Sequence, residues 1–350
     1  RNRTIDGAAT SRHPRAMIWI AAHEDDEHGA AVGERLTELG ADWLRIGARE
    51  LAQHYLYSID PLQPAFAAES LFARLDRRDG SGSPAAAAKA VSAIYWRRPY
   101  RIGEALMRRF PSAAELSEAE AMAVFKQAVS AFPEAVFPLG HPDAQRRAEN
   151  KLLQLALAAK MGWRVPETVA GNDTRALRGL LERHETCVVK PLGHPIAYHA
   201  EDRGKIEDML WCRGLPSRVL LDKLQGVQSA QMMVQQAVKK RADWRVTVLA
   251  DAMVCCEIEA SGLPAGELDW RKVVMTLPHR IIDMPADFAA QVRAFLSAIH
   301  LPAGCLDFAI DDAGQPWFLE NNPNGQWLWI EQLTGHPISL HVAKALLREP

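Results

Sequence analysis

The sequence predicts an α/β chain of 350 residues in which an open α/β domain precedes a larger part of mixed α+β character. Strand and helix patterns alternate near the N-terminus, whereas antiparallel hairpins with tight turns follow in the later half. A composition of 48% hydrophobic and 24% charged residues is typical of a globular protein. A chain of this length buries a sizeable core and is expected to form two or three domains.

The first domain is expected at residues 16–142, after a tail at 1–15 that lacks the apolar core of a signal peptide. Residues 16–22 (AMIWIAA) form an apolar run typical of a buried strand. An amphipathic helix pattern over 29–40 and a second strand pattern over 43–46 complete a βαβ unit. Further along, the sequence predicts a flexible connector at 79–90, a strand at 93–96 and a helix at 115–131.

The second part begins with a predicted helix at residues 143–161, in which Leu152, Leu155 and Ala159 share a face. We expect one α+β subdomain at 143–229 and another at 230–350. The remaining predicted elements are a helix at 173–183, strands at 187–190, 230–238, 243–250 and 253–260, a helix at 286–299, a hairpin over 304–322 and a helix at 339–347.

Charge and cysteine usage exclude several classes of function. Forty-one basic and 43 acidic residues give a net charge of -2, which argues against binding nucleic acid through bulk charge. No apolar run is long enough to span a bilayer. The five cysteines show no C-x-x-C spacing, which favours reduced, buried thiols in a cytoplasmic protein.

Three familiar motifs carry little weight. The sequence has no P-loop, and residues 80–85 fit G-x-G-x-x-A only in low-complexity sequence without a preceding strand. The acidic cluster HEDDEH at 23–28 lacks H-E-x-x-H spacing. We interpret it as a helix start, in which acids meet the positive end of the helix dipole, rather than as a metal site.

The last predicted hairpin contains the most informative residues. Asp307 alternates with apolar neighbours in a strand, where a carboxylate is costly unless another group satisfies it. Glu320 and Asn322 are two residues apart and project to one side of an extended chain. Together these three residues offer hard oxygen ligands suited to Mg²⁺. By itself the E-x-N pattern leaves a second interpretation open, in which Asn321, Asn322 and Asn324 only cap and shape the turn around Pro323 and Gly325.

Two lysines and a hinge-like segment precede this hairpin. Lys151 lies early in a predicted helix, and Lys190 ends an apolar strand; a lysine ammonium is a compact charge able to hold phosphates. The strand VQQAV at 234–238 and the pair Asp243 and Arg245 follow. Each lysine alone would be interpreted as an ordinary solvated side chain, so the ordered series is what matters.

This ordered series, over residues 143–347, resembles the ATP-grasp ligases. The resemblance implies that ATP binds between two α+β subdomains. It further implies phosphate contacts from Lys151 and Lys190, an adenine contact from Gln236, Ala237 and Val238, a position near the ribose for Asp243, and Mg²⁺ ligands in Asp307, Glu320 and Asn322.

Finer motifs are similar to one branch, the microviridin or graspetide type of ATP-grasp peptide maturases. These motifs are IYWRRP at 94–99, AENKLLQL at 148–155, CVVKPL at 187–192, LDWRK at 268–272 and FLENNPNGQW at 318–327. Such enzymes form side-chain ester or amide links within a ribosomal precursor peptide. The sequence departs from the pattern in having only Gly193 where many ATP-grasp enzymes have a glycine-rich loop, and Gln236 where amino-acid ligases often have Glu.

The implied reaction activates a carboxylate of the peptide as an acyl phosphate, which a hydroxyl or amine then attacks. Arg245 and Arg271 are the candidates for holding the phosphate and the tetrahedral oxyanion. Two other functions stay open: a ligase of the same fold that adds free amino acids to a small acceptor or a protein tail, and a non-catalytic peptide-binding relative. We also expect a homodimer that binds neither nucleic acid nor membrane.

Overall fold

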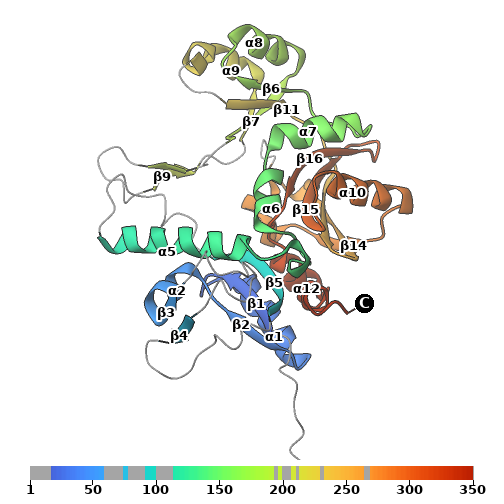
Figure 1. The fold of residues 1–350 in the computed structure, drawn as a ribbon. Coiled ribbons are helices and arrows are strands. Elements are labelled where there is room, and N and C mark those ends of the chain that lie inside the picture. The colour runs from blue at the N-terminus through green and yellow to red at the C-terminus, as the bar shows by residue number, and fades with distance from the viewer. Residues whose placement is uncertain are drawn as a thin grey trace, which may run out of the picture. The chain divides into compact units, whose positions relative to one another are not determined.

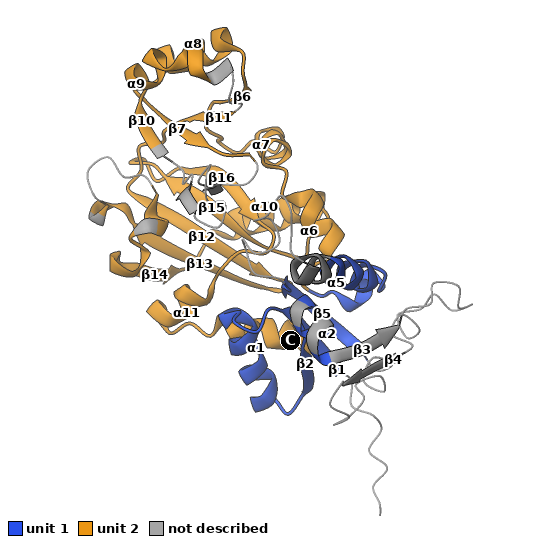
Figure 2. Cartoon of the chain, turned by 90° about the vertical axis from the view of Figure 1, so that its left-hand side faces the viewer, with its two compact units in different colours: residues 1–101, 114–138 blue, residues 102–113, 139–350 orange. Residues whose placement is uncertain are grey.

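The computed structural model describes residues 17–58, 74–77, 91–99, 113–192, 196–198, 206–209, 213–228, 232–263 and 269–349. The tail, the connector at 79–90 and Gly193 lie outside these residues. The chain divides into two compact units, shown in Figure 2. One is Arg1–Arg101 with Ala114–Pro138, and the other is Ile102–Ala113 with Leu139–Pro350.

The first unit is built on a parallel sheet of three strands in the order β2-β1-β5 (Figure 1). Helix α1 connects β1 to β2, as the βαβ pattern predicts. The elements of this unit are β1 (Met17–Ala22), α1 (Glu27–Glu38), β2 (Asp42–Arg45), α2 (Ala48–His54), β3 (Tyr55–Ser58), β4 (Arg74–Arg77), β5 (Val91–Arg98), α5 (Ala113–Ser130) and a 3₁₀ turn at Glu134–Val136.

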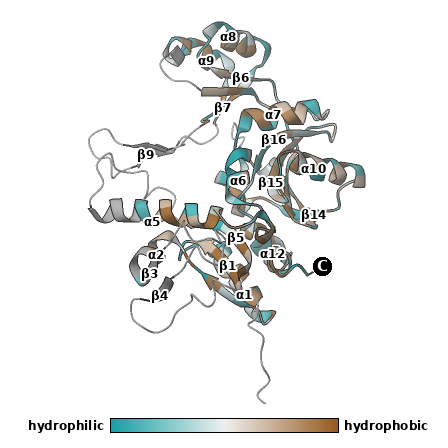
Figure 3. Ribbon diagram, in the orientation of Figure 1, coloured by the Kyte–Doolittle hydropathy of each residue, from teal (hydrophilic) through white to brown (hydrophobic). Residues whose placement is uncertain are grey.

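Alternation along β1 lets both faces of this sheet be covered. Trp19 belongs to a buried cluster with Phe125 and Val129 of α5, whereas Ile20 on the other face lies next to Gly29 of α1. Strand β1 is mainly hydrophobic in Figure 3. The unit therefore has the helix–sheet–helix layering of an open α/β domain.

The acidic cluster at 23–28 starts a helix, as predicted. Asp26 is the N-cap of α1, and its Oδ1 accepts a hydrogen bond from the Gly29 N–H at 2.7 Å. The ligand atoms of His23, Glu24 and Asp25 also lie within 4.8 Å of one another. However, the Nδ1 atom of His23 accepts the Asp25 N–H at 3.1 Å, a bond within the turn that precedes the helix.

The second unit contains two larger sheets and most of the helices. Its first elements are α6 (Pro142–Ala148), α7 (Lys151–Lys160), β6 (Thr168–Gly171), α8 (Thr174–Arg183), β7 (Thr186–Lys190), β8 (Ile196–Tyr198), β9 (Ile206–Met209), β10 (Arg213–Pro216), α9 (Ser217–Asp222) and β11 (Met232–Gln236). The later ones are β12 (Ala242–Leu249), β13 (Ala252–Glu259), β14 (His279–Ile282), α10 (Ala286–Ala298), β15 (Ala303–Ile310), β16 (Pro316–Asn322), α11 (Leu328–Thr334) and α12 (Ile338–Leu347).

The smaller of these sheets has four antiparallel strands in the order β10-β7-β11-β6. Helix α8 buries Leu177, Leu180 and Leu181 in one cluster with Cys187 of β7 and Val234 of β11. Asp173 caps this helix at its N-terminus. This sheet thus has its own small core beside the strand that ends in Lys190.

The larger sheet has five antiparallel strands in the order β14-β13-β12-β15-β16. Aromatic rings fill the core on one face, where Trp163 lies 5.1 Å from Phe295, 5.3 Å from Phe308 and 5.4 Å from Phe318, measured between ring centroids. Since neighbouring residues of a strand point to opposite faces, this core leaves Asp307 on the other face. That alternation agrees with the sequence prediction.

The single helix predicted at 143–161 is wrong. The chain forms two helices, α6 and α7, because Asn150 caps the second one by accepting the Leu153 N–H at 3.0 Å. The predicted apolar face is also wrong in part, since Leu152 is 43% exposed and Ala159 is exposed, while Leu155 is buried. The break brings Lys151 to the first turn of a new helix.

The described cysteines Cys187, Cys255, Cys256 and Cys305 are free and buried, as predicted. Among the described residues, no helix has the length and apolar character needed to cross a membrane.

Candidate functional site

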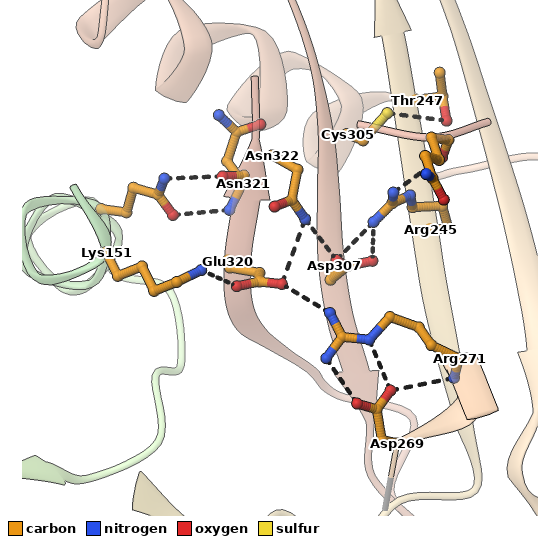
Figure 4. Close-up of polar contacts among 12 residues, drawn as sticks. Lys151, Arg245, Thr247, Asp269, Arg271, Cys305, Asp307, Glu320, Asn321 and Asn322 are labelled. Atoms are coloured by element: carbon orange, nitrogen blue, oxygen red, sulfur yellow. Dashed lines mark hydrogen bonds and ion pairs between the residues drawn. The ribbon is translucent and has the colours of Figure 1, made fainter. Parts of the chain in front are cut away.

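The β15–β16 hairpin brings the three predicted metal ligands together. Asp307 lies opposite Glu320 in the strand register, next to a β-bulge, and Asn322 is two residues further along β16. The Nδ2 atom of Asn322 donates to Asp307 Oδ2 at 3.2 Å and to Glu320 Oε1 at 3.3 Å. Figure 4 shows the three side chains pointing toward one another.

Arg245 of β12 neutralises Asp307. The two residues are direct partners in the β12–β15 register, and Nη1 of Arg245 donates to both carboxylate oxygens, at 2.7 and 2.6 Å. Nη2 donates to the carbonyl oxygen of Gln326 at 3.0 Å. Because Arg245 is 5% and Asp307 is 7% exposed, this is a buried, charge-assisted pair.

Cations from two segments contact Glu320. Lys151 of α7 pairs with its carboxylate, and Nη1 of Arg271 lies 3.5 Å from Oε1. Arg271 is in turn held by Asp269, whose oxygens accept from Nε at 2.7 Å and from Nη2 at 2.8 Å. The Arg271 side chain remains 41% exposed, so this guanidinium lies at the border between the site and solvent.

The electrostatics of the two carboxylates differ. Burial acts to raise the pKa of Glu320, but the charges of Lys151, Lys190 and Arg271 outweigh it and hold that pKa below its usual value. Burial raises the pKa of Asp307, and the neighbouring Glu320 adds to this effect, while Arg245 opposes it. The surrounding cations thus favour the ionised form of Glu320.

The donor set fits a divalent cation such as Mg²⁺. Two carboxylates and one amide meet on one face of the hairpin, and all three can present oxygen atoms, which Mg²⁺ prefers. The amide of Asn322 offers its oxygen to the same place when it turns over, because oxygen and nitrogen exchange positions in that flip.

The segment expected to contact adenine begins at the last residue of β11, Gln236. The backbone N–H of Gln236 donates to Glu167 O at 2.9 Å, and its side-chain Oε1 accepts the Glu167 N–H at 3.3 Å. The Ala237 N–H donates to Thr186 O at 3.1 Å. These bonds fix Gln236 and Ala237 beside the start of β7. An adenine contact from Gln236, Ala237 and Val238 stays a prediction.

Asp243 is buried, whereas a residue that contacts a ribose has to be accessible to the nucleotide. It is 2% exposed and forms an ion pair with Lys240, whose Nζ lies 2.6 Å from Oδ2. Burial raises its pKa to about 6, although Lys240 opposes the shift. The structure thus presents Asp243 as a buried partner of Lys240, and a ribose contact stays a prediction.

Two residues of the site were not predicted. Asp269 holds Arg271, and its D-x-R spacing within LDWRK is the signal that could have indicated it. Gln154 on α7 bonds to the backbone of Asn321. No local signal indicates this second contact, because 167 residues separate the partners.

The sequence matches no family model and no curated protein. Solved structures do match along almost the whole chain. One is the macrocyclase MdnC of Microcystis aeruginosa, bound with precursor peptide MdnA, at 21% identity and a TM-score of 0.76, covering 95% of this chain and 99% of that one. Another is an ATP-grasp ligase associated with a ribosomal peptide (RiPP) from Chryseobacterium gregarium, in complex with ADP and a leader and core peptide. It gives 21% identity, a TM-score of 0.79, and coverage of 96% and 98%.

The chain has the ATP-grasp fold. A third relative, the ATP-grasp ligase PsnB complexed with minimal precursor, Mg and ADP, is similar at 19% identity with a TM-score of 0.71, covering 97% of this chain and 99% of that one. The fold predicted from the series of lysines, hinge strand and metal hairpin is thereby confirmed. Within the ATP-grasp fold, the Asp307–Glu320 hairpin is the candidate catalytic centre.

Proposed function

We propose that this protein is an ATP-grasp peptide ligase. It joins Asp or Glu side chains of a ribosomal precursor peptide to hydroxyl or amine side chains of the same peptide, closing ester or amide macrocycles. The observation that carries the proposal is the hairpin site, in which two carboxylates and an amide converge among Lys151, Arg245 and Arg271.

The relatives support the choice of substrate. MdnC is a macrocyclase bound with its precursor peptide, and the Chryseobacterium ligase is in complex with a leader and core peptide. Both cover nearly the full length of this chain. The alternative of a small acceptor has support from D-cycloserine synthetase DcsG, which matches at a lower TM-score of 0.55 and 15% identity over 95% of this chain.

ATP and Mg²⁺ are the proposed cofactors. Asp307, Glu320 and Asn322 would hold the metal, and Lys151 and Lys190 would hold the phosphates. When bound, the metal ion neutralises charge on the phosphates during transfer. Lys151 already contacts Glu320, and Lys190 contributes to lowering the pKa of that carboxylate, so both ammonium groups lie near the proposed metal ligands.

The chemical steps need cations rather than a nucleophilic side chain. A peptide carboxylate attacks the γ-phosphorus of ATP, so that ADP leaves and an acyl phosphate forms. A hydroxyl or amine then attacks the acyl carbon, and phosphate leaves as the new bond closes. Arg271, partly exposed and fixed by Asp269, is placed to steady the departing phosphate or the oxyanion. Arg245 donates to Asp307 and to the Gln326 carbonyl oxygen, and these bonds order the β15–β16 hairpin.

The first test uses ADP formation in the presence of Mg²⁺ and a precursor peptide encoded beside the gene. Lys190→Ala and Glu320→Gln should each reduce the rate at least about 100-fold while the protein stays folded, because both groups act on phosphoryl transfer. Lys239→Ala and Glu38→Gln are matched controls, since each removes an exposed charge with a surface partner. A near wild-type rate for either site variant would remove that residue from the proposal.

A homodimer and a cytoplasmic location stay predictions from the sequence alone. Gel filtration with light scattering measures the first.

A further inference from the structure

One buried side chain joins the two elements that form the hairpin site. Gln154 lies on α7, three residues after Lys151, and is 2% exposed. Its Nε2 donates to the carbonyl oxygens of Ala148 at 2.6 Å and Asn321 at 2.9 Å, and its Oε1 accepts the Asn321 N–H at 2.8 Å. Figure 4 shows the two bonds at Asn321.

This amide takes the place of a neighbouring strand. β16 is the edge strand of the five-stranded sheet, with β15 on one side. A side chain that donates to and accepts from the backbone of one residue makes the pair of bonds that a next strand would make. Further along the same edge, the Phe318 N–H donates to Arg164 O at 2.8 Å. Gln154 therefore covers the end of the edge that carries the site.

The hydrogen bonds of Gln154 also position the charged groups on α7 and β16. Asn321 lies between Glu320 and Asn322, so fixing its backbone fixes the direction of both neighbouring side chains. Lys151 is one helical turn before Gln154, on the same side of α7. The bond to Ala148 also holds the end of α6, where the chain turns into α7. One amide thus sets α7 against β16.

We propose that Gln154 is a positioning residue, which sets the Lys151 ammonium opposite Glu320 by clamping the Asn321 backbone. The inference rests on the proposed function, because the distance between the Lys151 ammonium and the Glu320 carboxylate matters for ATP turnover. A shift of about 1 Å in a catalytic group costs up to about 100-fold in rate. Loss of these bonds should therefore lower kcat by a large factor while the protein remains folded.

The test replaces Gln154 with Met, which keeps the volume and removes all three bonds. We expect kcat for peptide-dependent ADP formation to fall about 10- to 100-fold, with a smaller change in KM for ATP. Binding of Mn²⁺ in the presence of ADP, followed by electron paramagnetic resonance, should weaken at least about fivefold. The matched control is Gln145→Met. Gln145 lies on α6, is 6% exposed, and donates to the carbonyl oxygen of Gly140 at 3.1 Å.

A double-variant comparison separates positioning from a general loss of packing. If Gln154 acts through the Lys151–Glu320 pair, the double variant Gln154→Met with Lys151→Met loses less kcat than the product of the two single losses. Losses that multiply would overturn the proposal. So would a Gln154→Met protein that matches Gln145→Met in both kcat and Mn²⁺ binding.

A second variant covers the case in which Gln154→Met fails to fold. Gln154→Glu keeps the size and the acceptor, and only its protonated form can donate to Asn321 O. Its kcat relative to wild type should rise as the pH falls from about 8 to about 6; a flat ratio overturns the proposal. Wild-type protein that binds no magnesium nucleotide would overturn the proposed function together with this inference, whereas an active wild type with an unaffected Gln154→Met overturns the inference alone.

Discussion

At the scale of residues, the site consists of buried charges that each have a named partner. Asp307 is paired with Arg245, Glu320 with Lys151, and Asp243 with Lys240. Leaving one member of such a pair alone in a buried environment is strongly unfavourable. The sequence identified Asp307 as a carboxylate in need of a partner. It could not say which cation would be that partner, because the register of two strands decides it.

The pair formed by Asp243 and Lys240 yields a pH prediction. The folded-state pKa of Asp243 is raised from 3.8 to about 6, so the folded protein binds this proton more tightly than the unfolded chain. Its stabilising contribution is present below about pH 4 and is lost as the pH rises through about 6. Relative to Asp243→Asn, the wild-type free energy of unfolding should fall over this range, by at most about 3 kcal/mol.

Urea unfolding of both proteins at several pH values measures this difference. Asp312→Asn is the control, because Asp312 pairs with Lys239 at the surface. Parallel stability curves for wild type and Asp243→Asn would show that Asp243 titrates normally.

At the scale of elements, the local patterns predicted strands and helices well where one face is buried. β15 and β16 follow from alternation and from the turn at Gly314, and the core on one face has the expected members Leu306, Phe308 and Ile310. The helix at 143–161 failed because Asn150 fits a helix interior by periodicity but bonds as a cap. Whether such a side chain lies inside a helix or caps the next one depends on how the helices pack.

The turn after β16 gives a prediction for this element. Gly325 sits so close to its neighbours that an added Cβ would lie 2.4 Å from Cβ and 2.6 Å from Sγ of Cys305, and 3.2 Å from Nη2 of Arg245. Gly325→Ala should therefore lower the free energy of unfolding by about 1–3 kcal/mol. It should also reduce ADP formation, because the turn and Arg245 must shift together.

Thermal unfolding and the ADP assay measure both effects. Gly226→Ala is the matched control, since nothing lies within 4 Å of a Cβ at that glycine. Equal behaviour of the two variants would mean that the turn adapts without disturbing Arg245.

At the scale of the whole molecule, the order of the motifs predicted more than their individual signals. Lys151 and Glu320 lie 169 residues apart, yet the structure brings them into contact. Lys151 alone would be interpreted as a solvated side chain, and the E-x-N pattern alone as part of a turn. Their order along the chain indicated the ATP-grasp fold. The α7–β16 clamp by Gln154 could not be predicted in this way, because it depends on how a helix docks on a sheet edge.

The central claim is that the chain closes rings within a peptide, and the intact mass of the precursor tests it most directly. The peptide is incubated with wild-type protein, ATP and Mg²⁺, with Glu320→Gln as the inactive control. Each ester or amide bond expels one water, so the account predicts stepwise losses of about 18 Da, each with one ATP converted to ADP. A precursor of unchanged mass, together with amino-acid-sized additions to another acceptor, would contradict the account and favour the free amino-acid ligase.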